Sequence, residues 1–126
     1  MLYAIFCYSQ EDVVGCWSKA EDDKVMADLA EVQDRLAAAG RLGPVARLVP
    51  TTAATTLRKS PEPLVLDGPF AETKEQLLGF YIVDCASLDE ALDTARDLAR
   101  ANPGPGCYEI RPVALFHPGG DVGSVG

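Results

Sequence analysis

The sequence predicts an α+β fold of the ferredoxin-like split βαβ type, in which two helices cover one face of an antiparallel sheet. Two long apolar runs, residues 2–8 and 77–85, are typical of buried strands. A stripe of apolar residues at helical spacing follows each run, at about 19–39 and 88–101. Short strands complete two strand–helix–strand halves of similar length.

The first half begins with LYAIFCY at residues 2–8, a continuous apolar segment that predicts a buried central strand. Residues 10–17 contain a glycine and predict a loop. Ser18 and Glu21 have the spacing of a capping box, which marks the start of the first helix. Gly40 is suited to follow its last residue, because glycine readily adopts the left-handed conformation that ends many helices.

The middle of the chain predicts a short strand and a hairpin. Residues 44–49 alternate weakly between apolar and polar, as a short strand does. Two further strands, at 54–59 and 64–66, flank the turn sequence SPEP at 60–63. Residues 67–74 predict a loop, because they contain a Gly-Pro pair that neither a helix nor a central strand accommodates.

The second half repeats the pattern of the first. Residues 77–85 predict a long buried strand, and Ser87 and Glu90 repeat the capping-box spacing. Prolines and glycines at 102–106 end the second helix, and residues 108–116 predict the last strand.

The first strand carries apolar side chains on both of its faces. Tyr3, Ile5 and Cys7 point to one side, whereas Phe6 and Tyr8 point to the other. Two helices cover only one face of the predicted sheet, so the second face needs cover from outside the chain. We therefore expect a homodimer that forms through the faces without helices.

Size and charge limit the number of domains and the kinds of partner. The 126 residues predict one domain, at residues 1–116, and a flexible glycine-rich tail at 117–126. The net charge of −8 argues against binding to nucleic acid or to anionic membrane surfaces, both of which favour basic proteins. No apolar run approaches the roughly 20 residues of a membrane span, and the N-terminus lacks the features of a signal peptide, so we expect a cytoplasmic protein.

The four cysteines form no CxxC pair, and the chain contains a single histidine. The sequence therefore predicts neither a metal site nor a disulfide framework, and no motif indicates a cofactor. If the strands at 2–8 and 77–85 are parallel neighbours and the last strand runs antiparallel beside the first, Cys7, Cys85 and Cys107 lie at one end of the sheet. We expect these three residues to be buried, reduced thiols.

Four segments resemble one protein family. TTAATTLR at 51–58, LVLDGPFAETKEQLLGFYIVD at 64–84, SLDEALDTA at 87–95 and YEIRPV at 108–113 are similar to the DGPF-domain branch of the YCII-related proteins. The resemblance implies a dimeric α+β barrel, in which two ferredoxin-like sheets pack face to face. It also implies a small-molecule-binding protein or an enzyme, and some members lie beside genes for extracytoplasmic-function sigma factors.

The sequence departs from this family at two positions. The wider group is thought to use a dyad of a histidine on the first helix and an aspartate near the motif loop. The corresponding helix segment here, at about 25–30, has no histidine. Leu78 stands where this branch usually has glycine. The first departure argues against a dyad mechanism and weakens the case for an enzyme. Asp67, the aspartate of the DGPF motif, is the candidate catalytic residue.

Asp67 has two explanations that the sequence leaves open. An aspartate at the start of a turn accepts backbone N–H bonds, and Gly68 and Pro69 provide turn dihedral angles. Alternatively, Asp67 lies at the mouth of the barrel, where burial raises its pKa and it acts as a general base. In that case Gly68 and Pro69 line the ligand site.

The other candidate ligand-binding residues also have structural alternatives. Thr73 and Lys74 either belong to a solvated loop or present donors to an anionic ligand. Phe70 and Tyr81 suit a hydrophobic core, but the Tyr81 hydroxyl can orient a substrate.

Two charged residues of the last strand are further candidates. Glu109 and Arg111 point to the same face. If that face lines the barrel, their charges need partners, such as Arg58, and form either a salt bridge at the interface or an anion site.

Two hypotheses of function follow. The first is a small-molecule-binding protein or a cofactor-independent enzyme that uses Asp67 for proton abstraction, isomerisation or elimination. The alternative is a non-catalytic accessory or regulatory protein that acts by protein contact, in connection with an extracytoplasmic-function sigma factor.

Overall fold

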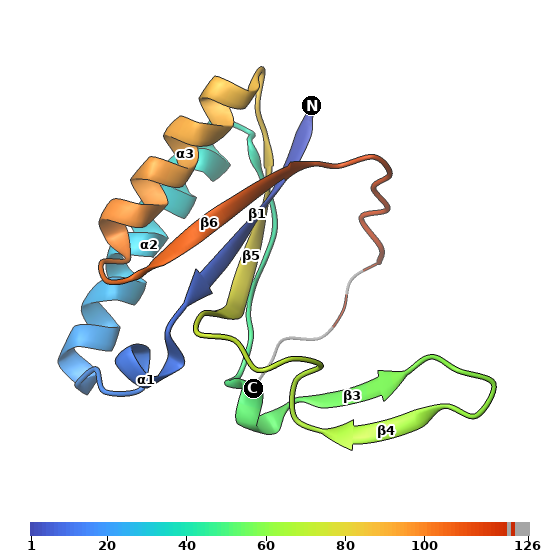
Figure 1. Ribbon diagram of the computed structural model, residues 1–126. Coiled ribbons are helices and arrows are strands. Elements are labelled where there is room, and N and C mark those ends of the chain that lie inside the picture. The colour runs from blue at the N-terminus through green and yellow to red at the C-terminus, as the bar shows by residue number, and fades with distance from the viewer. Residues whose placement is uncertain (121, 123–126) are drawn as a thin grey trace.

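Four strands form an antiparallel sheet in the order β2-β5-β1-β6 (Figure 1). They are β1 (Leu2–Ser9), β2 (Leu42–Arg47), β5 (Gln76–Asp84) and β6 (Gly106–Pro112). The computed structural model describes residues 1–120 and 122. The α+β class and the antiparallel sheet are confirmed, and the strand order is consistent with a ferredoxin-like fold.

The two long helices, α2 (Lys19–Ala38) and α3 (Leu88–Ala101), lie on the same face of this sheet (Figure 1). The predicted capping box is present at the start of α2. The Glu21 backbone N–H donates to the Ser18 hydroxyl at 3.1 Å, and the Ser18 N–H donates to the Glu21 carboxylate at 3.3 Å. Ser87 caps α3 in a similar way, so both helices begin where the sequence predicts.

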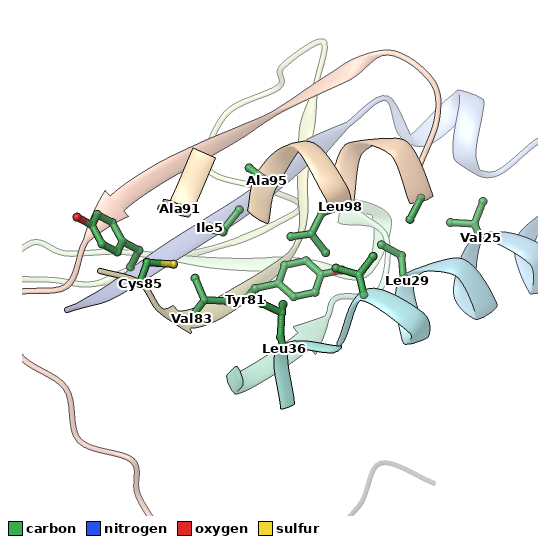
Figure 2. Close-up of a cluster of buried hydrophobic side chains, with 13 residues drawn as sticks. Ile5, Val25, Leu29, Leu36, Tyr81, Val83, Cys85, Ala91, Ala95 and Leu98 are labelled. Carbon is green, nitrogen blue, oxygen red and sulfur yellow. The ribbon is translucent and has the colours of Figure 1, made fainter. Parts of the chain in front are cut away.

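The hydrophobic core lies between the helices and the sheet (Figure 2). Ile5 and Val83 from the sheet and Leu98 from α3 are fully buried. Ile5 lies opposite Tyr81 in the pairing of β1 with β5, so the two side chains share the face that the helices cover. One set of alternate residues in each central strand therefore forms the core.

The other set of alternate residues forms a face that neither long helix covers (Figure 1). We call it the helix-free face and define it by six residues: Ala4, Phe6, Phe80, Ile82, Glu109 and Arg111. Its large apolar side chains are half-buried, and its two charged residues are exposed. The homodimer and the barrel expected through this face stay predictions, since the structure contains one chain.

A hairpin projects from the helix-free side of the sheet, away from the helices (Figure 1). Its strands are β3 (Thr55–Arg58) and β4 (Leu64–Asp67), which form a separate two-stranded antiparallel sheet. We call residues 55–67 the arm. The sequence predicts this hairpin, although the residues before it, Thr51–Ala53, form the short 3₁₀ helix η1.

Two predicted elements differ from those observed. Residues 10–17 are not entirely a loop, because they contain the four-residue helix α1 (Glu11–Val14). The last strand ends at Pro112, not at residue 116. It ends there because β1 begins at Leu2, whose carbonyl accepts the last hydrogen bond of the pair, so β6 has no further partner.

The predicted C-terminal tail is described only in part. Residues 117–120 and 122 form neither helix nor strand. Residue 121 and residues 123–126 lie outside the described part of the chain.

The prediction that three cysteines cluster is wrong for Cys85. The strand parallel to β1 is β2, which follows α2 and is not adjacent to β1 in the sheet. β5 lies between these two strands and runs antiparallel to both. The Cys85 N–H consequently donates to the Met1 carbonyl, at the opposite end of the sheet from Cys7. Cys107 lies beside β1 as predicted, opposite Tyr8, but it is exposed. Cys7 and Cys85 are buried, and both are free thiols.

The core and the surface of α3 provide a matched test of this packing. Leu98→Ala removes a fully buried side chain, and we expect the free energy of unfolding to fall by about 2–5 kcal/mol. Leu88→Ala makes the same change at a side chain that is 52% exposed, and we expect a change within about 0.5 kcal/mol. Urea denaturation measures both values, and equal losses would contradict the assigned core.

Candidate functional site

Asp67 is the last residue of the arm, and its carboxylate is exposed. Backbone groups, not this carboxylate, stabilise the turn that follows. The Gly68 N–H donates to the Ala54 carbonyl at 2.8 Å, and the Thr56 hydroxyl donates to the Gly68 carbonyl at 2.8 Å. Asp67 makes no side-chain hydrogen bond or ion pair within residues 1–120. A single chain therefore provides neither the turn cap nor the burial that the two explanations of this residue require.

The rest of the motif folds back along one face of the arm. Gly68 adopts a φ of 94°, a left-handed conformation that favours glycine. The Arg58 guanidinium donates to the Phe70 carbonyl at 3.1 Å, so the loop after Pro69 is attached to β3. The Phe70 ring itself is 72% exposed, not part of the core.

Thr73 and Lys74 lie in the exposed loop before β5. The Thr73 hydroxyl donates to the Glu75 carbonyl at 2.5 Å, so it serves the local turn. Lys74 makes no ion pair with any of the described residues. Among the described residues, no contact brings these two donors to a common binding site.

Glu109 and Arg111 do share one face of β6, as the sequence predicts. That face is the helix-free face, since Glu109 lies opposite Phe6 and Arg111 opposite Ala4. Partial burial and the nearby Glu109 raise the pKa of Tyr8. Within the described chain neither charge pairs with Arg58, whose guanidinium is bonded to the loop.

Tyr81 lies on the opposite side of the sheet, within the core between the sheet and the helices (Figure 2). It is 7% exposed, and burial, together with nearby Cys7, raises its pKa. A hydrogen bond with Gln33 acts in the opposite direction. The predicted site residues thus lie in three places: the arm with its loop, the helix-free face, and the core.

A cavity of about 640 Å³ lies between α2 and the sheet, and α1 and the segment after β2 contribute to its walls. Most of its lining is apolar. The apolar residues include Val14, Trp17, Met26, Leu29, Leu48 and Leu78. The polar residues include Ser9, Glu11, Gln33, Arg47 and Tyr81.

The polar side chains in this cavity have defined partners. Ser9 is buried, and its hydroxyl lies 3.9 Å from the Cys7 sulfur. The Arg47 guanidinium bonds to the Asp22 carboxylate at 3.2 Å and to the Met26 sulfur at 3.2 Å. The cavity therefore offers mainly neutral hydrogen-bonding groups; its one arginine is paired with the Asp22 carboxylate, and its Glu11 carboxylate is bonded to Thr51.

Glu11 connects two walls of the cavity. Its carboxylate accepts from the Thr51 N–H at 2.6 Å and from the Thr51 hydroxyl at 2.7 Å. The Glu11 N–H donates to the Gln76 side chain at 3.0 Å, so α1 is also attached to the start of β5. These bonds hold α1 against η1, the segment from which the arm begins.

This cavity was not predicted, although the sequence of α2 contains one pattern that indicates it. Met26, Ala30 and Gln33 recur at helical spacing, beside the apolar stripe of α2 that enters the core. Of the residues predicted for the site, only Tyr81 lines the cavity. Within the described residues, no group of histidine, cysteine, aspartate or glutamate side chains could hold a metal ion. Equally, none of the described helices is long and apolar enough to cross a membrane.

A half-buried tyrosine, Tyr108 of β6, predicts sensitivity to alkali. Burial, together with nearby Cys7, raises the pKa of Tyr108 above the ordinary value of 10.0. Above about pH 10 the unfolded chain loses this proton while the folded chain retains it, so the free energy of unfolding falls as the pH rises. Between about pH 9 and about pH 11, we expect the free energy of unfolding to fall less for Tyr108→Phe than for the natural chain, as measured by urea denaturation. An equal fall in both would contradict the assigned burial of Tyr108.

Comparisons with known proteins identify one family. A family model described as the YCII-related domain matches residues 1–117. The chain is also 68% identical, over 120 residues, to an uncharacterized protein of Rhizobium meliloti (strain 1021). That alignment covers 94% of this chain and 97% of the relative, so the similarity extends over nearly the whole of both proteins.

Proposed function

The chain belongs to the YCII-related domain family, and we propose that it binds a small organic molecule in the cavity between α2 and the sheet. The size of the cavity carries this proposal. About 640 Å³ lies within the range of roughly 300–1,000 Å³ that is typical of ligand pockets. A mainly apolar lining with a few polar groups is also typical of such pockets.

The lining favours one class of ligand: an apolar molecule with a single hydrogen-bond acceptor. Trp17, Met26 and Leu29 offer apolar contacts to the body of such a molecule. Like any tyrosine, Tyr81 keeps its proton at neutral pH, so its hydroxyl can donate a hydrogen bond. Arg47 already pairs with Asp22, so the cavity does not favour a strongly anionic ligand.

If the protein also catalyses a reaction, Asp67 is our candidate for the acid or base. The chemistry would be proton abstraction, isomerisation or elimination, which a carboxylate supports without a cofactor. Asp67 does not line the cavity, and one chain leaves it exposed. The catalytic role therefore requires a second chain that buries this carboxylate.

A non-catalytic accessory or regulatory protein is the second candidate, and the arm is the feature that favours it. Leu57 and Val65 of the arm, and Phe70 in the loop that follows it, expose more than half of their side chains, which suits contact with another protein. An extracytoplasmic-function sigma factor is the partner that the family resemblance implies.

Binding of N-phenyl-1-naphthylamine tests the cavity, because this uncharged dye fluoresces strongly in apolar sites. Ala30→Phe places a ring in the lining, and we expect it to abolish the fluorescence enhancement. Ala27→Phe is the matched control: it adds the same ring at an exposed alanine of α2 that does not line the cavity. Equal binding to both variants, or none to the natural chain, would contradict the proposal.

The catalytic role has a separate test. For any substrate found to bind and turn over, we expect Asp67→Asn to abolish turnover while changing the free energy of unfolding by less than about 0.5 kcal/mol, because the side chain is exposed in one chain. Full turnover by this variant would rule out Asp67 as the acid or base. Dye binding to the same variant reports on the cavity independently.

A further inference from the structure

Two polar side chains, Ser9 and Asn102, line one end of the cavity between α2 and the sheet. Ser9 is the last residue of β1, and Asn102 directly follows α3. Both also line a smaller cavity of about 240 Å³, whose walls include residues 103–107. The two cavities therefore meet at this pair of side chains.

The Ser9 hydroxyl has only a weak partner, although the residue is 8% exposed. That partner is the Cys7 sulfur at 3.9 Å, a long contact to a weak acceptor. Gly106 lies opposite Ser9 and leaves the hydroxyl clear, since a Cβ atom at residue 106 would lie 3.2 Å from Ser9 Oγ. Buried hydroxyls in folded proteins usually have a strong partner. The Ser9 hydroxyl therefore indicates a position where a bound molecule can supply one.

The side-chain amide of Asn102 uses its nitrogen but not its oxygen. Asn102 Nδ2 donates to the Tyr108 hydroxyl oxygen at 3.3 Å and lies 3.7 Å from the Cys7 sulfur. The Tyr108 hydroxyl donates in turn to the Leu98 carbonyl at 3.5 Å, so it accepts from Asn102. This sequence of bonds distinguishes the nitrogen of the amide from its oxygen. Asn102 Oδ1 makes no hydrogen bond among residues 1–120 and 122, so it is an unused acceptor.

The donor and the acceptor lie at one point of the cavity wall. Ser9 and Asn102 both contact the Cys7 sulfur, and Cys7 also lines the cavity. Tyr81 lines the cavity near the same cysteine. This end of the cavity thus offers the hydroxyl donors of Ser9 and Tyr81 together with one acceptor, the Asn102 oxygen. A ligand group that satisfies all of them must both accept and donate a hydrogen bond.

We propose that the ligand of this cavity is an apolar alcohol whose hydroxyl group lies between Ser9 and Asn102. The ligand oxygen accepts from the Ser9 hydroxyl, and the ligand O–H donates to Asn102 Oδ1. An ether of the same size has no donor, so it would bury the Asn102 oxygen without a partner, which opposes binding. This inference rests on the proposed function and specifies the acceptor of its ligand as a hydroxyl oxygen.

Two isomers, 1-octanol and 1-methoxyheptane, test the preference, because they differ in whether the oxygen carries a hydrogen. Each is titrated into the natural protein with N-phenyl-1-naphthylamine bound, and displacement is measured as loss of the dye fluorescence. We expect 1-octanol to displace the dye at a concentration about tenfold lower, or less. The ether is the more apolar isomer, so a purely apolar cavity would favour it. Equal displacement, or a preference for the ether, would overturn the proposal.

Two substitutions of Asn102 separate its acceptor from its contribution to the fold. Asn102→Leu and Asn102→Asp both remove the bond from Nδ2 to Tyr108, but only aspartate retains an acceptor oxygen at this position. We expect Asn102→Asp to keep the preference for 1-octanol and Asn102→Leu to lose it. A purely structural role of Asn102 would change both variants alike. The same preference in the two variants would therefore contradict the proposed contact.

Ser9→Ala removes the proposed donor and has a matched control. We expect this variant to need about threefold more 1-octanol, or more, to displace the dye, with no change for 1-methoxyheptane. Ser60→Ala makes the same change at an exposed serine of the arm and leaves both values unchanged. Circular dichroism confirms that each variant is folded. A Ser9→Ala variant that binds 1-octanol like the natural chain would rule out the contact with Ser9.

These results separate the alcohol from the cavity itself. If the natural chain binds no dye, the proposed function and this inference fail together, because the alcohol occupies the same cavity. If the dye binds and the alcohol has no advantage over the ether, this inference alone fails, and the cavity stands as an apolar binding site.

Discussion

Both long helices pack on the same face of the four-stranded sheet, and this one-sided cover is the constraint on which the other features depend. The helix side buries Ile5, Val83 and Leu98 and contains the cavity. The other side leaves Phe6 and Phe80 only half-buried. Burial of apolar surface is the main driving force of folding and association, so a chain with one covered face gains stability from a second copy on the other.

The two sides of the sheet have different parts in the proposed function. The cavity is formed entirely by one chain, and its walls are held by the bonds of Glu11 to Thr51. The DGPF motif begins at the end of the arm, where Asp67 has no side-chain partner among residues 1–120 and 122. Because η1 joins the Glu11 contact to the arm, the cavity wall and the arm are adjacent in the chain. Binding in the cavity and contact through the arm are therefore distinct properties, although η1 connects the two regions.

The sequence predicts the elements well wherever local chemistry determines them. The capping residue Ser18 sets the start of its helix, and the turn at 60–63 sets the hairpin. Features that depend on packing between distant segments are harder to predict. The cavity joins α2 to the segment after β2, and no local pattern brings them together. The direction of β5 relative to β1 depends on the path of the whole chain. The predicted position of Cys85 was wrong for this reason.

The central claim is that the uncovered face of the sheet is satisfied by a second copy of the chain. Light scattering of the natural protein at low micromolar concentration measures the mass in solution directly. A mass twice the 13.4 kDa of one chain is the result that this account predicts. A stable monomer of 13.4 kDa would contradict it, because Phe6, Phe80 and the apolar side chains of the arm would then face water without a partner.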